Sequence, residues 1–184
     1  MARNPTPGEP VDRMGRRVGL ASMKVRLAEM EDAEAIRSIY NVEVAGSTVT
    51  FDLVERTLED QQAWLAARSG AHTTLVAVDE SGSVTGFAAL SPYRDRPAYR
   101  TTVEDSIYVS RDHQGQGVGR LLLGELVEAA AASGFHAMMA RIVGGHAASI
   151  ALHQGQGFAI VGTEREVGRK FNHWLDVVVM QRLL

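Results

Sequence analysis

Three glycines at every second position, Gly115, Gly117 and Gly119, stand between a predicted strand and a predicted helix. Glycine has no Cβ, so such a loop lets successive backbone N–H groups approach an anion closely. The helix that follows brings the positive end of its dipole to the same place. The loop therefore predicts a binding site for a phosphate or pyrophosphate.

Two well-known phosphate loops do not fit this segment. A P-loop carries a Lys-Ser/Thr pair after its second glycine, whereas Arg120-Leu121 stands in that place here. A dinucleotide-binding fingerprint counted from Gly115 needs its third glycine at the position of Arg120. Taken alone, the segment would favour a plain glycine-rich turn before a helix.

Strand and helix signals alternate along the chain from residue 24. Apolar spacing and capping signals predict helices at 32–44, about 57–68, 117–133 and 147–156. Runs of β-forming residues predict strands at 24–28, 73–78, 84–90, 101–110, 135–143, 158–166 and 174–183. This order predicts a single α/β domain over 23–184 with a mixed sheet. Residues 1–22 hold three of the five prolines and few bulky apolar residues, which predicts a disordered extension.

Composition excludes several classes of protein. Hydrophobic residues make up 45% of the chain, which is enough for a packed core, and no apolar run is long enough to span a membrane. The net charge of −3 argues against a dedicated nucleic-acid binder. The absence of cysteine excludes disulfides, thiolate metal sites and cysteine nucleophiles. The six histidines form no metal-binding pattern, so we expect no metal. Because no apolar run could span a membrane, we expect a cytoplasmic protein.

Residues around the glycine loop resemble a known family. Gln114, Gly117 and Gly119 fill the fixed positions of the signature Q/R-x-x-G-x-G/A of the GCN5-related N-acetyltransferases (GNAT). The resemblance runs from about Val25 to the C-terminus. It is closest to the branch of phosphinothricin and methionine sulfoximine or sulfone N-acetyltransferases. The segments that carry it are 39–41, 47–52, 94–99, 103–109, 149–153 and 174–177.

The resemblance implies a sheet splayed between its fourth and fifth strands, with acetyl-CoA as co-substrate and a small primary amine as acceptor. It implies that the backbone of Ile107, Tyr108 and Val109 binds the pantetheine arm, with His146 and Ser149 close to that arm. It also implies a pyrophosphate site made by Gln114, Gly115, Gln116, Gly117, Val118, Gly119 and Arg120. Relatives in this branch are typically dimers, so a homodimer is expected by analogy.

The resemblance also suggests two catalytic residues. Glu104 would accept the proton of the incoming ammonium group, directly or through water. Without the resemblance, an exposed strand glutamate paired with an arginine would be the simpler interpretation. His153 would relay a proton or position the amine, and a helix histidine with a satisfied hydrogen bond is an equally good alternative.

An arginine-rich loop suggests the substrate class. Arg94 and Arg96 could bind a carboxylate or an oxyanionic sulfur or phosphorus group. The resemblance adds Tyr99 as a substrate contact and Phe51 as a pocket wall. The resembled branch acetylates phosphinothricin, methionine sulfoximine or methionine sulfone, so the resemblance implies that this chain acetylates and detoxifies such compounds.

Two positions depart from the wider family. His146 stands where an asparagine is common, and Phe158 stands near the place of a tyrosine proposed to protonate the leaving thiolate. Two other functions therefore stay open. The chain could acetylate another amine or a protein N-terminus, or it could be a non-catalytic sensor that binds acyl-CoA.

Overall fold

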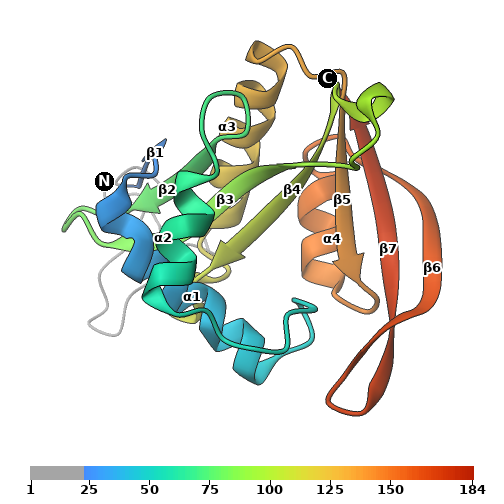
Figure 1. Ribbon diagram of the computed structural model, residues 1–184, viewed down its shortest axis with the longest axis horizontal. Coiled ribbons are helices and arrows are strands. Elements are labelled where there is room, and N and C mark those ends of the chain that lie inside the picture. Colours follow the sequence, from blue (N-terminus) through green and yellow to red (C-terminus); the bar gives the residue numbers. More distant parts are fainter. Residues whose placement is uncertain (1–22) are drawn as a thin grey trace, which may run out of the picture.

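The computed structural model describes residues 23–184, so the predicted extension 1–22 lies outside the described residues. Seven strands form one mixed sheet in the order β1-β2-β3-β4-β5-β7-β6 (Figure 1). The strands are β1 (Lys24–Leu27), β2 (Thr74–Val78), β3 (Val84–Pro92), β4 (Thr102–Val109), β5 (Ala137–Val143), β6 (Ala159–Lys170) and β7 (His173–Leu183). The helices are α1 (Ala33–Gly46), α2 (Leu58–Ala66), α3 (Val118–Ala132) and α4 (Ala147–Gln154). The predicted α/β class with a mixed sheet is confirmed.

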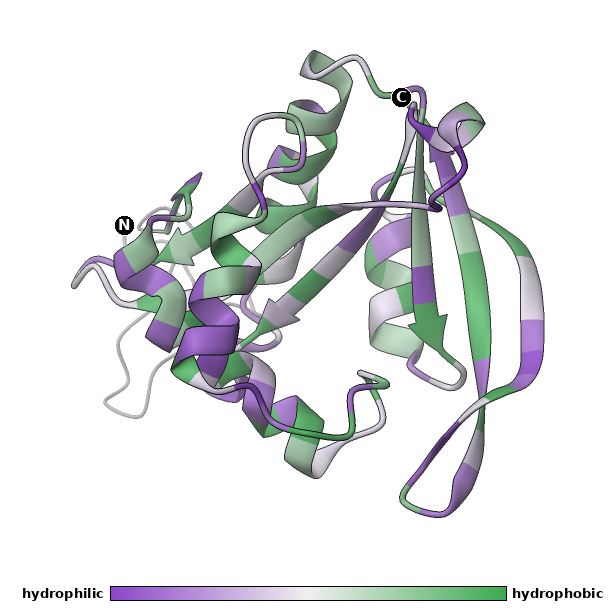
Figure 2. Cartoon of the chain, in the orientation of Figure 1, coloured by the Kyte–Doolittle hydropathy of each residue, from purple (hydrophilic) through white to green (hydrophobic). Residues whose placement is uncertain are grey.

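Each face of the sheet has its own apolar core, because alternate strand residues point to opposite faces. On one face, α3 packs Leu122, Leu123 and Leu126 against strand residues such as Leu90 and Val103. On the other face, α1 and α2 pack against neighbouring strand positions that include Val76 and Phe87. Hydrophobic residues run along the central strands (Figure 2). The sheet is thus covered by helices on both faces, and the packing of α3 fixes the position of its N-terminus relative to β4.

The sheet opens between β4 and β5, as the resemblance implied. These two strands are parallel and pair only over Thr102–Glu104 and Ala137–Met139. Beyond Glu104, β4 keeps its pairing with β3 as far as Val109 but has left β5. Figure 1 shows the two strands meeting at one end of the sheet and diverging toward the other. One edge of β4 therefore presents unpaired backbone groups to the gap.

The last two strands form a long twisted hairpin at the edge of the sheet (Figure 1). β6 runs to Lys170, four residues past the strand predicted at 158–166. A two-residue turn at Phe171 and Asn172 closes the hairpin, and both residues have positive φ, as this kind of turn requires. Sequence alone did not extend β6, because residues 164–168 interrupt the ladder and break its alternation.

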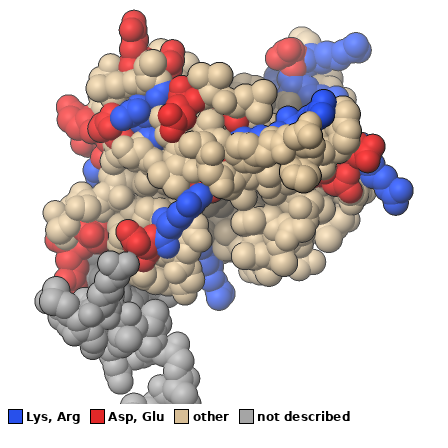
Figure 3. All heavy atoms as spheres, turned by 90° about the horizontal axis from the view of Figure 1, so that it is seen from below, with Lys and Arg blue, Asp and Glu red and all other residues tan. Residues whose placement is uncertain are grey.

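The other boundaries differ little from expectation. The Thr57 cap predicted before α2 is present, since its side chain accepts from the Asp60 amide while the Asp60 carboxylate accepts from the Thr57 amide. Residues 47–52 form an irregular segment that leads from α1 toward α2. Among residues 23–184, no helix has the length and apolar character needed to cross a membrane. On the face drawn in Figure 3, acidic and basic side chains of the described residues are interspersed.

Candidate active site

A cavity of about 620 Å³ occupies the gap between β4 and β5. Its walls come from the diverging strands, from the start of α3, from α4 and from the segment that follows α1. Residues 104–109 line one side and residues 140–143 the other. The cavity thus lies where the sheet offers unpaired backbone groups of β4 to a ligand.

The glycine loop forms one end of this cavity. Gly115 and Gly117 adopt φ values of +73° and +86°, which side-chain-bearing residues rarely adopt. Gly117 caps α3, and the amide of Leu121 is bonded to the Gly117 carbonyl at 3.1 Å. The amides of the first helical turn therefore have no acceptor within the helix. This geometry suits an anionic group such as a diphosphate.

Glu104 lies where β4 leaves β5, and its side chain is half-buried. Burial raises the pKa of the Glu104 carboxyl, and the carboxylates of Asp105 and Glu164 add to that rise, whereas Arg141 and Arg94 oppose it. Arg141 shares a sheet face with Glu104, since β5 residues 138, 140 and 142 pack into the opposite core. Its Nη1 donates to Glu164 Oε1 at 2.9 Å. A carboxylate with a raised pKa beside a cavity is suited to accept a proton.

Asp105 and His153 meet on the other face of β4. The exposed fractions of these residues are 8% and 3%, and His153 Nε2 lies 3.1 Å from Asp105 Oδ2. His153 Nδ1 lies 2.7 Å from the Ser149 carbonyl, which can only accept, so Nδ1 carries a proton. Burial opposes the charged ring, but the hydrogen bond and charge of Asp105 outweigh it and raise the pKa of His153. Asp105 Oδ1 is buried without a hydrogen-bond partner among the described residues.

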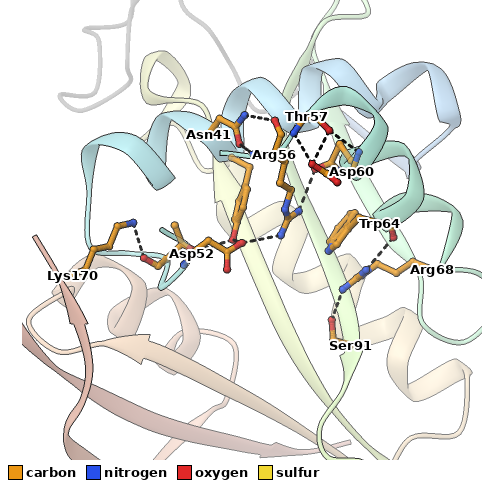
Figure 4. Close-up of polar contacts among 12 residues, drawn as sticks. Asn41, Asp52, Arg56, Thr57, Asp60, Trp64, Arg68, Ser91 and Lys170 are labelled. Carbon is orange, nitrogen blue, oxygen red and sulfur yellow. Dashed lines mark hydrogen bonds and ion pairs between the residues drawn. The ribbon is translucent and has the colours of Figure 1, made fainter. Parts of the chain in front are cut away.

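The segment between α1 and α2 is held by a polar network (Figure 4). Tyr40 Oη lies 2.8 Å from Thr50 Oγ1 and donates to Asp52 at 2.7 Å. The Arg56 guanidinium stacks over the Tyr40 ring at 3.9 Å, and Arg56 exchanges backbone hydrogen bonds with the Asn41 side chain. This network places Phe51 at the cavity wall.

Comparison with known proteins shows the family. A family model described as an acetyltransferase (GNAT) domain matches residues 25–179. The L-methionine sulfoximine/L-methionine sulfone acetyltransferase of Pseudomonas aeruginosa is 42% identical over 162 residues, which are 87% of this chain and 94% of that protein. The chain belongs to the GNAT family. The resemblance noted from the sequence is confirmed, and the protein is an acyl-CoA-dependent N-acetyltransferase.

Two further relatives agree with this GNAT assignment. The phosphinothricin N-acetyltransferase of Streptomyces coelicolor is 40% identical over 169 residues, 90% of this chain and 99% of that protein. A solved structure of a phosphinothricin acetyltransferase from Sinorhizobium meliloti, in complex with AcCoA, has a TM-score of 0.85 and 38% identity, and covers 89% of both chains.

Most of the predicted site residues of this GNAT enzyme line the cavity. They are Phe51, Glu104, Ile107, Tyr108, Val109, Gln114, Gly115, Gly117, Val118, Gly119, Arg120, His146, Ser149 and His153. Gln116 belongs to the glycine loop but turns its amide to the Asp112 carbonyl at 2.8 Å. Arg94, Arg96 and Tyr99 lie in the exposed loop before β4 and do not line the cavity. Arg94 stacks on Tyr93 and Tyr99 there.

Sequence reasoning missed two residues that line this site, Asp105 and Arg141, and one that supports its wall, Lys170. Asp105 was passed over because the pattern around Glu104 gave no sign that its neighbour would meet a helix 48 residues away. Arg141 was predicted as an ordinary strand residue. Its charge within the otherwise buried pattern of β5 was the available signal. Lys170 is 3% exposed, and only the hairpin geometry brings it to the loop after α1.

Proposed function

We propose that this enzyme transfers the acetyl group of acetyl-CoA to the primary amine of a small amino-acid analogue such as methionine sulfoximine, methionine sulfone or phosphinothricin. The relatives with these named activities support the substrate class. The observation that carries the chemistry is the Glu104 carboxyl at the mouth of the gap, with a raised pKa and a cavity in front of it. The amine attacks the thioester directly in a ternary complex, the C–S bond breaks and CoA leaves as its thiolate. The chain has no cysteine that could carry the acetyl group as a thioester intermediate.

Acetyl-CoA fits the glycine-loop end of the cavity. The open amides at the start of α3 would hold its pyrophosphate, with Gln114 and Arg120 beside them. The unpaired edge of Ile107, Tyr108 and Val109 would bond the pantetheine arm as a neighbouring strand does. The acetyl thioester would then lie near Glu104, where the two strands part.

In this proposal Glu104 takes the proton from the substrate ammonium group, directly or through water. A pKa above the ordinary carboxyl value makes Glu104 a better proton acceptor than an unperturbed carboxylate. His153 is poorly placed for this task, because its Nδ1 proton is bonded to Ser149 and its Nε2 faces Asp105. We propose instead that His153 holds a proton beside the cavity and, through its bonds to Ser149 and Asp105, positions the wall formed by α4 and β4.

The acidic group of the substrate needs a cation. Arg94, Arg96 and Tyr99 remain candidates, since the charge of Arg94 already acts on Glu104. Arg141 lies in the cavity itself and stands on the same sheet face as Glu104. We propose that Arg141 and Arg94 together receive the carboxylate or the oxyanionic sulfur or phosphorus group.

A homodimer through the edge strand is also part of this proposal. Ile160, Val161 and Val167 on β6 and Trp174 on β7 are each at least half exposed. An exposed apolar edge strand is a surface that proteins usually cover. Sedimentation equilibrium measures this directly, and Val161→Lys should give a monomer if the edge is the contact.

The test of function is release of free thiol from acetyl-CoA, read with a thiol-reactive dye, because the cysteine-free protein gives no background. The amines are methionine sulfoximine, methionine sulfone, phosphinothricin, common amino acids, a polyamine and a short peptide. Turnover confined to the first three supports the proposal. Turnover with the peptide alone points to protein N-termini, and tight acetyl-CoA binding without turnover points to a sensor.

The cellular role that follows is detoxification in the cytoplasm. Expression of the chain should let sensitive bacteria grow in methionine sulfoximine or phosphinothricin. Glu104→Gln, expressed at the same level, is the matched control and should leave the cells sensitive.

A further inference from the structure

The closed end of the β6–β7 hairpin contacts Phe51, which lines the cavity in the part that the proposed function assigns to the amine, here called the amine end. A Cβ added at Gly168 would lie 2.2 Å from Cε2 of Phe51, so the Phe51 ring rests directly on the glycine backbone. Gly168 has no positive φ that would otherwise require glycine. Phe51 keeps 40% of its surface exposed, so it is a wall between hairpin and cavity and not a core residue. The space for this ring exists because residue 168 lacks a side chain.

Two residues further along the hairpin, the Lys170 side chain binds the backbone of segment 47–52, which carries Phe51 (Figure 4). Its side chain is buried, and Nζ donates to the Thr50 carbonyl at 2.9 Å and approaches the Glu43 carbonyl at 3.5 Å. Glu43 supplies one of the last four carbonyls of α1, the negative end of the helix dipole, which favours a cation. Thr50 directly precedes Phe51, so this bond fixes the backbone that carries the ring.

The other side of the segment is fixed independently. Tyr40, Asp52 and Arg56 hold it to α1, as described above. Phe51 therefore stands between two anchors, one from α1 and one from a strand more than 100 residues away in the chain. The hairpin anchor touches the ring itself at Gly168.

We propose that Gly168 and Lys170 are positioning residues that clamp the segment 47–52 against the hairpin and thereby set where Phe51 bounds the amine pocket. The clamp determines which amines fit without touching the reacting atoms. It rests on the proposed function, because only an enzyme that binds an amine at this end needs the wall there. Acetyl-CoA, held by the glycine loop, should not depend on it.

The first test concerns the contact itself and needs no activity. Gly168→Ala should lower the Tm by about 5 °C, since overpacking forces the ring to move. In a Phe51→Ala background the same substitution should cost nothing, because the space is then free. Gly162→Ala is the matched control on the same strand, where an added Cβ meets nothing within 4 Å. An equal Tm loss in both backgrounds would overturn the clamp.

The second test separates the amine from the cofactor. Lys170→Met keeps the length of the side chain and removes its charge, and should raise KM for the best amine by about fivefold or more while KM for acetyl-CoA stays within about twofold. Arg169→Met, the adjacent exposed cation, should change neither constant. Equal rises of both constants in Lys170→Met, at unchanged sedimentation, would show a general structural role and refute the proposal.

Failure of the clamp and failure of the proposed function give different results. If no amine is acetylated but the Gly168–Phe51 coupling is present in Tm, the proposed function is wrong and the contact stands. If amines are acetylated but the coupling is absent, the clamp is wrong and the proposed function stands.

Discussion

The two faces of β4 at the gap in the sheet are built in different ways. On the face toward α3, the proposed anion-binding end of the cavity is formed by one continuous segment, residues 114–120, and its main groups are backbone amides at glycines. On the face toward α1, the cavity is bounded by side chains from separate parts of the chain, Phe51, Glu104 and Arg141. The hairpin end at Gly168 supports that face from outside. The face with backbone amides suits the acetyl donor, which is the same for all substrates. The face with side chains suits the amine acceptor, which differs between the named relatives.

The sharpest test of this division removes the proposed base. Glu104→Gln should lower kcat by about 100-fold or more, the usual contribution of a general base. Acetyl-CoA binding, measured by calorimetry, should be unchanged because the amide keeps the shape of the carboxylate. The substitution thus removes proton transfer on the face toward α1 and leaves acetyl-CoA binding on the face toward α3 unchanged. Unchanged turnover in Glu104→Gln would show that the base lies elsewhere.

The second test acts on the opposite face. Gly117→Ala forces a side-chain-bearing residue into a left-handed conformation, which costs about 1–3 kcal/mol and should raise KM for acetyl-CoA about tenfold. KM for the amine should stay within about twofold, since the amine end shares no segment with the loop. Gly124→Ala inside α3, where a Cβ makes only an ordinary contact, should leave both constants alone. Parallel changes in both KM values would contradict the division.

The same division explains how much could be predicted from the sequence. The place of the glycine loop between β4 and α3 was predicted, because its spacing and its position before a helix are local features. The alternation of strands and helices likewise gave the mixed sheet. The Asp105–His153 pair, Arg141 beside Glu104 and Lys170 on the Thr50 carbonyl were not predicted, because each depends on strand register or on contacts across 37 to 120 residues of chain. Local patterns do not encode such distances.

The third test uses the charges around Glu104. Arg141 and Arg94 favour its ionised form, while Asp105 and Glu164 disfavour it. Arg141→Met removes a cation and leaves Glu164 unpaired, so the pKa of Glu104 should rise further and the acid limb of kcat/KM should move to higher pH. At the acidic end, activity should fall about two- to fivefold relative to the variant's own plateau. Arg141→Lys keeps the charge and should keep the wild-type pH profile. An acid limb that does not move in Arg141→Met would show that Arg141 does not influence the ionisation of Glu104.

The smallest effect is expected from the pair on the α4 side. The pKa of His153 is raised in the folded protein, so its stabilising contribution is fully present below its unfolded pKa and is lost as pH rises through the folded one. Asp105→Asn removes the charge that favours the imidazolium ring. The Tm gap between wild type and Asp105→Asn should therefore be larger at pH 6 than at pH 9, by about 3 °C. Glu125→Gln, on the exposed face of α3, should show no such growth. A gap for Asp105→Asn that stays constant from pH 6 to pH 9 would contradict a His153 charge that depends on Asp105.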